Sequence, residues 1–254
     1  MMLQSEQWFT KIKYAYWKAK FIIKTGYQDR AISSLEQLHR ALLGSIAAGE
    51  NLRTIEFALA NDDMALTPNG DSSHAIWAFA CRLINGDQDR LWLIPDFAFW
   101  SRPEAPGWYD EMRQRAAQGN ALISDEVPSA AWRGVVWTDK WVRKPLMELQ
   151  NETWAEIEEV VSKTGANVMP IEDFCRYGCI VHTEGRSWSG RLKYALNCDS
   201  VSTIHDLDWT SHYYHLLVPE GRHQNYVPVK RDFSDLGRKM GRFLESFGSA
   251  AHCQ

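Results

Sequence analysis

The stretch CIVHTEGRSWSGRLKYALNCDSVSTI, residues 179–204, contains the pattern from which the fold class is predicted. The apolar run at 179–183 reads as a short strand, and residues 185–190 form a turn of small side chains. Residues 191–198 then read as a helix, and residues 200–204 as another strand. A strand, turn and helix followed at once by another strand is typical of parallel sheets covered by helices.

The same alternation of strands and helices extends to both sides of this stretch. An apparent capping box at Ser33–Glu36 precedes apolar residues at helical spacing up to Ile46, and Gly49 is expected to end that helix. Further strands are predicted at 55–59, 91–94, 131–137 and 226–229, and further helices at 151–163, 209–217 and 235–247. The pattern is interrupted near residues 120–128, where we place a seam between two units of an α/β protein.

Composition indicates a folded chain and disfavours one class of partner. The 254 residues are 45% hydrophobic, which is enough apolar side chain to bury a core. The net charge of -4 is unlike that of nucleic-acid-binding proteins, which are usually basic, so we expect no nucleic-acid partner. Lysines interrupt the apolar runs of residues 1–24, so neither a signal peptide nor a membrane span is predicted there.

The cysteine count is odd, so at least one of the five thiols is unpaired within the chain. Cys175 and Cys179 are four residues apart, but no second pair with matching spacing follows them, and the eight histidines show no ligand spacing either. We therefore predict no metal site. A disulfide and buried free thiols are both compatible with the sequence.

The turn at residues 184–193, EGRSWSGRLK, is the strongest local signal for binding. Gly185, Ser189 and Gly190 allow a close backbone approach to an anion, while Arg191 and Lys193 add positive charge. The turn matches neither the P-loop nor the dinucleotide fingerprint. By spacing alone, an ordinary glycine-rich turn with exposed basic residues fits the pattern equally well.

Two further segments carry candidate site residues. Asp62 and Asp63 follow a predicted strand, at the end where ligands bind in open α/β sheets, and a carboxylate there can act as a general base. A turn rich in Asn and Asp is the ordinary interpretation of the same residues. Arg133, in the tripeptide Trp-Arg-Gly, is suited to pairing with either a phosphate or a structural carboxylate.

Several segments in this order resemble the fungal branch of glycosyltransferase family 90, which contains capsule-associated and protein O-glucosyltransferase-like enzymes. The likeness covers most of residues 50–245, and the Ser-Trp-Ser-Gly-Arg and Asp-Phe-Ser-Asp-Leu blocks are specific in combination. The segments are EFALANDDM (56–64), PDFAFW (95–100), AWRG (131–134), TEGRSWSGRLKYALNCDS (183–200) and NYVPVKRDFSDL (225–236).

This resemblance implies a two-lobed fold of the GT-B type, with the active site between two Rossmann-like halves. On that basis residues 1–124 form the N-terminal, acceptor-side lobe and residues 125–254 the C-terminal lobe that binds the nucleotide sugar. The implied reaction is inverting transfer of glucose or xylose from a UDP-sugar to a glycan or glycoprotein hydroxyl, with no metal and no cofactor. Asp63 is the implied base, and the implied donor-binding residues are Arg133, Gly185, Ser189, Gly190 and Arg191.

The resemblance also raises expectations about the N-terminus and the location of the protein. Family members are usually longer before the first motif, so we expect a shortened, incomplete N-terminal lobe here. They often carry a signal or an N-terminal membrane anchor, which implies the secretory pathway and membrane association through a segment that this sequence lacks. A non-catalytic member that binds nucleotide or carbohydrate is the alternative. A glycoside hydrolase fits less well, because adjacent carboxylates point to opposite faces of a strand.

Overall fold

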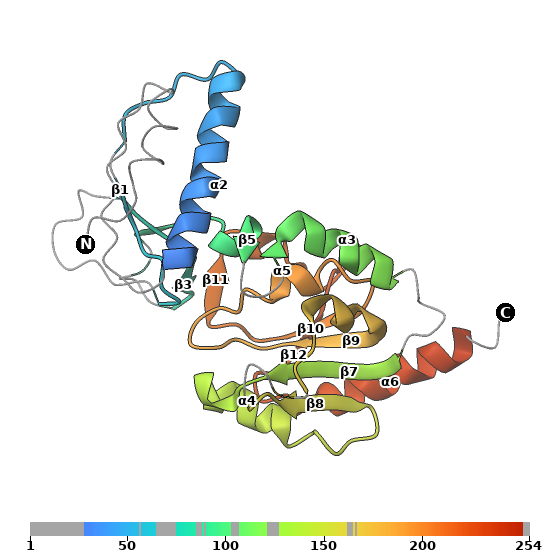
Figure 1. Cartoon of the computed structure of the whole chain (residues 1–254). Helices are drawn as coiled ribbons and strands as arrows, with labels where there is room; N and C mark the ends of the chain where they lie inside the picture. Colours follow the sequence, from blue (N-terminus) through green and yellow to red (C-terminus); the bar gives the residue numbers. More distant parts are fainter. Residues whose placement is uncertain are drawn as a thin grey trace.

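Five parallel strands form the main sheet of the protein, seen here in a computed structural model that describes residues 28–55, 57–64, 75–84, 88, 90–102, 107–120, 127–161, 165 and 167–250 (Figure 1). The order across the sheet is β12-β10-β9-β7-β8. The bounds are Val127–Gly134 for β7, Ala155–Glu159 for β8, Tyr177–His182 for β9, Val201–His205 for β10 and Val227–Val229 for β12. The strand order therefore reverses direction between β7 and β9, as in doubly wound sheets.

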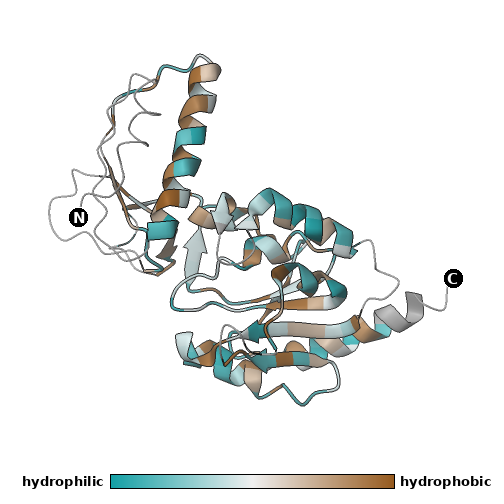
Figure 2. Cartoon of the chain, in the orientation of Figure 1, coloured by the Kyte–Doolittle hydropathy of each residue, from teal (hydrophilic) through white to brown (hydrophobic). Residues whose placement is uncertain are grey.

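Helices cover both faces of this large sheet, as Figure 1 shows. On one face α4 (Lys140–Met147) and α6 (Leu236–Ala250) pack against a core that includes Trp132 and Ile157. On the other face η4 (Ile171–Arg176) and α5 (Leu192–Ala195) cover Ala131 and Ile180. Successive residues of one strand thus serve opposite cores, which is the geometry of a buried parallel strand. Helix α3 (Tyr109–Asn120) packs on the outer side of η4 and α5. Figure 2, which colours each residue by hydropathy, shows that α3 is largely hydrophilic.

The first half of the chain forms a smaller parallel sheet. Its strands are β1 (Phe57–Leu59), β2 (Ala75–Ala78) and β4 (Leu91–Leu93), in the order β1-β2-β4. The long helix α2 (Gln28–Ala47) lies beside η1 (Phe97–Phe99) and the hairpin of β5 (Ser101–Arg102) and β6 (Gly107–Trp108). In the part of the chain that the structure describes, no helix is long and apolar enough to cross a membrane.

A strand pairing and a buried ion pair are among the contacts that join the halves. Strand β3 (Ala80–Arg82) pairs in antiparallel fashion with β11 (Trp209–Ser211), which comes from the second half. Lys193 forms an ion pair with Asp96 at 2.9 Å, and their side chains are only 2% and 1% exposed. Such a pair is held only when its geometry satisfies both charges. The predicted seam falls largely on residues 121–126, outside the described residues, so the lobe boundary stays a prediction.

The α/β class with parallel strands is confirmed, but three local predictions are wrong. Residues 151–163 contain strand β8 rather than a helix, because Ile157 enters the core between Glu156 and Glu158 in strand alternation. Residues 209–217 contain β11 and the short η5 (Tyr214–Leu216), because the backbone of 209–211 completes the pairing with β3. The predicted capping box lies inside α2, where the Ser34 hydroxyl donates to the carbonyl of Arg30.

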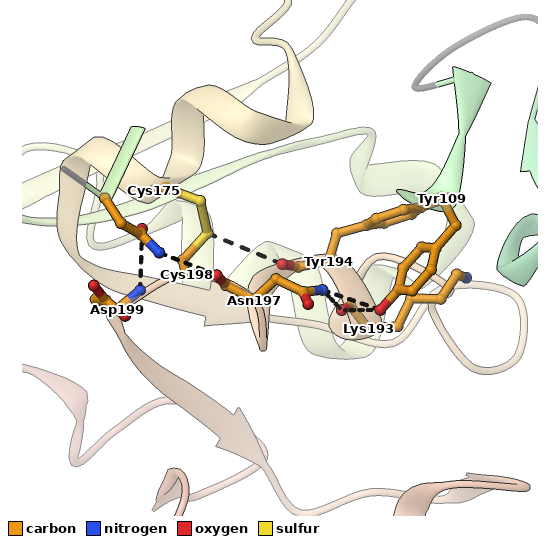
Figure 3. The surroundings of a disulfide bond; sticks show 8 residues. Tyr109, Cys175, Lys193, Tyr194, Asn197, Cys198 and Asp199 are labelled. Atoms are coloured by element: carbon orange, nitrogen blue, oxygen red, sulfur yellow. Dashed lines mark hydrogen bonds between the residues drawn. A yellow bond between two sulfur atoms is a disulfide. The ribbon is translucent and has the colours of Figure 1, made fainter. Parts of the chain in front are cut away.

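A disulfide joins Cys175, in η4, to Cys198, just beyond α5 (Figure 3). It closes a loop over β9, the turn at 184–193 and α5. Nearby, the Asn120 side chain of α3 donates to the carbonyl of Asn197 at 3.2 Å and accepts from the Asp199 amide at 3.2 Å. The sequence was compatible with a disulfide and with buried free thiols, and both occur: Cys175 is in the disulfide, and Cys179 is a buried thiol. Desolvation raises the pKa of Cys179 to about 12.

Because the disulfide closes a loop with a sequence separation of 23 residues, it should stabilise the chain by about 3 kcal/mol. We expect a Cys175→Ala/Cys198→Ala double variant to lose this amount in the free energy of unfolding, measured by urea denaturation. A reductant should destabilise the wild-type protein similarly and leave the double variant unchanged. Equal stabilities of the oxidised wild type and the double variant would contradict this assignment.

Candidate functional site

The carboxyl ends of β7 and β9 lie side by side at the point where the strand order reverses. In doubly wound sheets, ligands bind outside the strand ends at such a point, because the following segments diverge there. Of the candidate residues, Arg133 is the last residue but one of β7, which ends at Gly134, and Gly185 follows β9, which ends at His182. The topology therefore brings the Trp-Arg-Gly segment and the turn at 184–193 to one edge of the sheet.

The turn after β9 is tightly folded, with the Gly185 amide donating to the carbonyl of Ser187 at 2.9 Å. A β-carbon on Gly185 would lie 3.3 Å from the guanidinium of Arg143, and one on Gly190 would lie 3.1 Å from the ammonium of Lys193. Both glycines thus leave room for a cation of the protein. Gly185, Ser189, Gly190 and Arg191 are all partly exposed, so the turn presents these residues at an accessible surface.

Arg143 places a buried positive charge beneath this turn. Its Nε donates to the carbonyl of Glu184 at 2.9 Å, and a terminal nitrogen donates to the carbonyl of Val135 at 2.7 Å. Burial lowers the pKa of Arg143 to about 10, so the guanidinium remains charged at neutral pH. The strand-end carbonyls of β7 and β9 are therefore linked through one cation, which fixes the two segments relative to each other.

The two arginines predicted to bind a donor point in different directions. The guanidinium of Arg133 lies beside β8, 3.4 Å from the carboxylate of Glu156 and 3.2 Å from that of Glu158. Its backbone carbonyl instead accepts a hydrogen bond from the guanidinium of Arg191. The structure thus brings Arg191 and the Arg133 main chain together, while the Arg133 side chain forms structural ion pairs. The donor-binding roles of both arginines stay predictions.

Asp63 lies where the small sheet meets the turn at 184–193. The buried Ser187 hydroxyl donates to the backbone carbonyl of Asp63, although the two residues are far apart in sequence. The Asp63 carboxylate accepts from Arg30 of α2 at 2.7 Å, and its side chain is 36% exposed. Asp62 is exposed. Within the described residues, the one hydrogen bond that its carboxylate accepts comes from the Asp63 amide. The two adjacent aspartates therefore have different surroundings.

A network of hydrogen bonds and ion pairs centred on the Glu184 carboxylate connects the segments around the turn at 184–193. The Glu184 side chain is fully buried and accepts from the amides of Asp208 and Trp209 at 3.0 and 2.8 Å. Arg231, just after β12, pairs with Glu184 and with Asp208, each at 2.9 Å. Desolvation raises the pKa of Glu184, and the hydrogen bonds from Trp209 and Arg231 counteract that rise. The network thereby links the ends of β9 and β12 to the start of β11.

Two buried histidines complete the edge of the sheet. The Nε2 of His205 accepts from the Glu184 amide at 3.0 Å, and its Nδ1 lies 2.7 Å from the carbonyl of Asp206. This pair of contacts requires a neutral ring that carries its proton on Nδ1. Desolvation lowers the pKa of His205 to about 4 and that of His182, whose ring stacks on it, well below the usual value.

Sequence reasoning missed the residues that connect the segments: Arg30, Arg143, His182, Glu184, Ser187, His205 and Arg231. Glu184 and Ser187 lie within the turn at 184–193, and Arg231 lies within the segment 225–236, so both segments gave a sequence signal for these residues. Arg30 and Arg143 lie on helices with no motif around them. Among the described residues, no three His, Cys, Asp or Glu side chains gather in a way that could hold a metal ion.

The geometry defines a class of protein: a parallel α/β fold with cations at the switch point of one sheet and an aspartate from a second sheet beside them. The model of glycosyl transferase family 90 matches residues 24–251, and the chain belongs to this family of glycosyltransferases. A search of curated proteins found no match.

The buried neutral His205 predicts a dependence of stability on pH. Because its folded pKa is below its unfolded pKa of about 6.5, its contribution is fully present above that value and is lost as the pH falls toward about 4. We expect this residue to lower the free energy of unfolding by about 2 kcal/mol between pH 7.5 and about pH 5.

Urea denaturation at the two pH values measures the effect. A His205→Gln variant keeps an acceptor but cannot titrate, so its free energy of unfolding should fall less than that of the wild type. The control is His215→Gln, since His215 is exposed on η5. Parallel losses in the wild type and His205→Gln would contradict the prediction.

Proposed function

We propose that this chain is an inverting glycosyltransferase that moves glucose or xylose from a UDP-sugar to a hydroxyl of a glycan or protein. The observation that carries the proposal is the hydrogen bond from Ser187 to the Asp63 backbone, which joins Asp63 to the turn at 184–193. Family membership supplies the general activity, sugar transfer. The fungal branch, the particular sugar, the UDP donor and the metal-independent reaction belong to this proposal.

The proposed reaction is a single displacement. Asp63 accepts the proton of the acceptor hydroxyl while that oxygen forms a bond to the anomeric carbon of the sugar. The bond between this carbon and the diphosphate oxygen breaks on the opposite face, and the leaving diphosphate carries the displaced electron pair. Arg191, with Gly185, Ser189 and Gly190, holds the diphosphate. Preorganised positive charge at this point lowers the barrier, because charge develops there in the transition state.

A GT-B arrangement is part of the proposal, and two contacts support it. Asp63 follows β1 and Asp96 follows β4, so both lie at the carboxyl edge of the small sheet. They contact Ser187 and Lys193, which follow β9 at the carboxyl edge of the large sheet. Two parallel sheets whose carboxyl edges meet provide a donor side and an acceptor side for one reaction. In this arrangement Arg133 acts through its carbonyl, which holds Arg191.

The disulfide Cys175–Cys198 supports a secretory location, because such bonds persist in oxidising compartments. Membrane association through an N-terminal anchor remains an additional part of the proposal that the family resemblance suggests.

A non-catalytic family member that binds nucleotide or carbohydrate is a second candidate, favoured by one observation. Arg30 donates to one oxygen of Asp63 at 2.7 Å, so a donor of the protein already occupies part of the carboxylate that an acceptor hydroxyl would have to reach. Assays of UDP-sugar hydrolysis and of transfer to acceptors separate the two candidates, since only the enzyme releases UDP.

Asp63→Asn should reduce turnover by roughly 10²–10⁴-fold, the usual effect of removing a general base. The matched control is Asp62→Asn, which makes the same chemical change at the exposed neighbour and should cost far less. UDP affinity should barely change in either variant, because the base faces the acceptor. Release of UDP from a UDP-sugar measures turnover, and equal rates for Asp63→Asn and wild type would refute this mechanism.

Arg191→Ala should weaken UDP binding by about 1–3 kcal/mol, the usual scale for a lost charge-assisted hydrogen bond. Titration calorimetry measures the affinity, and circular dichroism checks that the variant is folded. Arg186→Ala is the control, since Arg186 belongs to the same turn but is exposed and lies over the ring of Trp137. Unchanged UDP affinity in a folded Arg191→Ala variant would remove Arg191 from the proposed donor site.

A further inference from the structure

A cavity of about 270 Å³ lies outside the site described above. Four elements of the first half of the chain form it: α2, η1, β6 and α3. Its lining combines three aromatic rings with one cation and one anion: Arg40, Phe99, Trp100, Trp108 and Asp110. Neither the proposed base nor the donor turn contributes to it.

Two indole rings form a corner in this cavity. The centroids of Trp100 and Trp108 are 5.0 Å apart, and the ring planes are inclined by 80°. Trp100 is fixed, because its Nε1 donates to Glu36 at 2.8 Å and the guanidinium of Arg40 lies 5.0 Å from its ring centroid. Trp108 is 46% exposed, so it offers apolar ring surface to a ligand.

The two charged residues at the rim of the cavity, Arg40 and Asp110, limit the kinds of ligand that it can bind. Arg40 is exposed and offers N–H donors, while Asp110 offers carboxylate oxygens and is 76% exposed. The partner of Asp110, Arg113, is 3.6 Å away and also exposed, which makes for a weak ion pair. Asp110 would repel an anionic ligand, and Arg40 would repel a cationic ligand. An apolar ligand would remove water from both charged groups without replacing its hydrogen bonds. A neutral ligand with an apolar face and hydroxyl groups satisfies all the lining groups, and a sugar ring has this chemistry.

The position of the cavity relates it to Asp63. Arg30, which pairs with Asp63, and Arg40, which lines the cavity, belong to the same helix. Ten residues of α-helix span about 15 Å along the axis. Both arginines also lie over rings of the same segment, Arg30 over Phe97 and Arg40 over Trp100. The proposed base and the cavity are therefore contacted from positions about 15 Å apart along one helix, a separation longer than a single sugar unit.

We infer that this corner cavity is a carbohydrate subsite that holds a remote unit of an extended acceptor glycan. The inference rests on the proposed function, because it assigns the acceptor as an oligosaccharide whose reacting hydroxyl lies at Asp63. Trp108 is the stacking surface, and Arg40 and Asp110 bind hydroxyl groups at its rim. The subsite contributes to binding of the acceptor and takes no part in the chemical step.

The test measures binding of neutral oligosaccharides to the full chain without a donor. A panel of glucose, mannose, galactose and xylose oligomers, with the corresponding monosaccharides, is titrated by calorimetry. We expect at least one oligomer to bind more tightly than its monosaccharide. Trp108→Ala should weaken this binding about tenfold or more, because the stacking surface is lost. Trp108→Phe should restore part of it.

The matched control is Trp141→Ala, which removes another exposed indole, 89% exposed, from α4 of the large-sheet unit. Its affinity for the oligomer should equal that of the wild type. Binding of no oligomer in the panel, or equal affinities of folded Trp108→Ala and wild type, would overturn the inference.

Calorimetry with UDP separates this inference from the proposed function. A chain that binds UDP but no oligosaccharide keeps the proposed donor site and loses the subsite. A chain that binds an oligomer through Trp108 but neither binds UDP nor turns over a UDP-sugar keeps a carbohydrate site and loses the proposed transfer reaction.

Discussion

The buried ion pair between Lys193 and Asp96 is the constraint on which the rest of the arrangement depends. The Lys193 ammonium donates to both carboxylate oxygens of Asp96 and to the carbonyl of Gly190, and Asp96 also accepts from the amide of Ala98. Two charges that are almost fully shielded from water are tolerable only together, since removal of either one leaves the other uncompensated at a cost of about 3–5 kcal/mol. The segment after β4 and the turn after β9 must therefore meet, and the contacts of Ser187 with Asp63 and of β11 with β3 join the same two halves.

Much of the large sheet could be predicted from the sequence because most of its strands are short apolar runs that are buried or partly buried. Residues 179–183 and 226–229 are apolar runs bounded by turns, and the structure has strands at or near both. The two strands that were predicted as helices, β8 and β11, have one physical cause in common. Residues 155–159 carry three glutamates, and their strand character comes from pairing with β7. Likewise residues 209–211 extend because β3 lies beside them. Local pattern carries no information about a partner strand that is distant in the chain.

In the candidate site, too, the local segments could be predicted from the sequence, while the contacts between distant segments could not. The turn at 184–193 and the Asp62–Asp63 pair could be singled out because small and charged residues follow predicted strands. Their environments could not be predicted, since Asp63 depends on Arg30 of α2 and Glu184 on Arg231 after β12. Arg133 illustrates the limit most clearly. Its residue type suits a phosphate, yet the glutamates of a strand that the pattern predicted as a helix hold its guanidinium.

The pairing of β3 with β11 has a consequence for how the molecule is made. The chain leaves the ribosome from its N-terminus, and domains generally fold in that order. Ala80–Arg82 is synthesised long before Trp209–Ser211, so one strand edge of the first half stays unpaired until most of the second half has emerged. The ion pair of Asp96 likewise cannot form until Lys193 has been synthesised. The first half is thus completed only when these partners from the second half are available, and final assembly of the nascent protein is a late event that involves both halves.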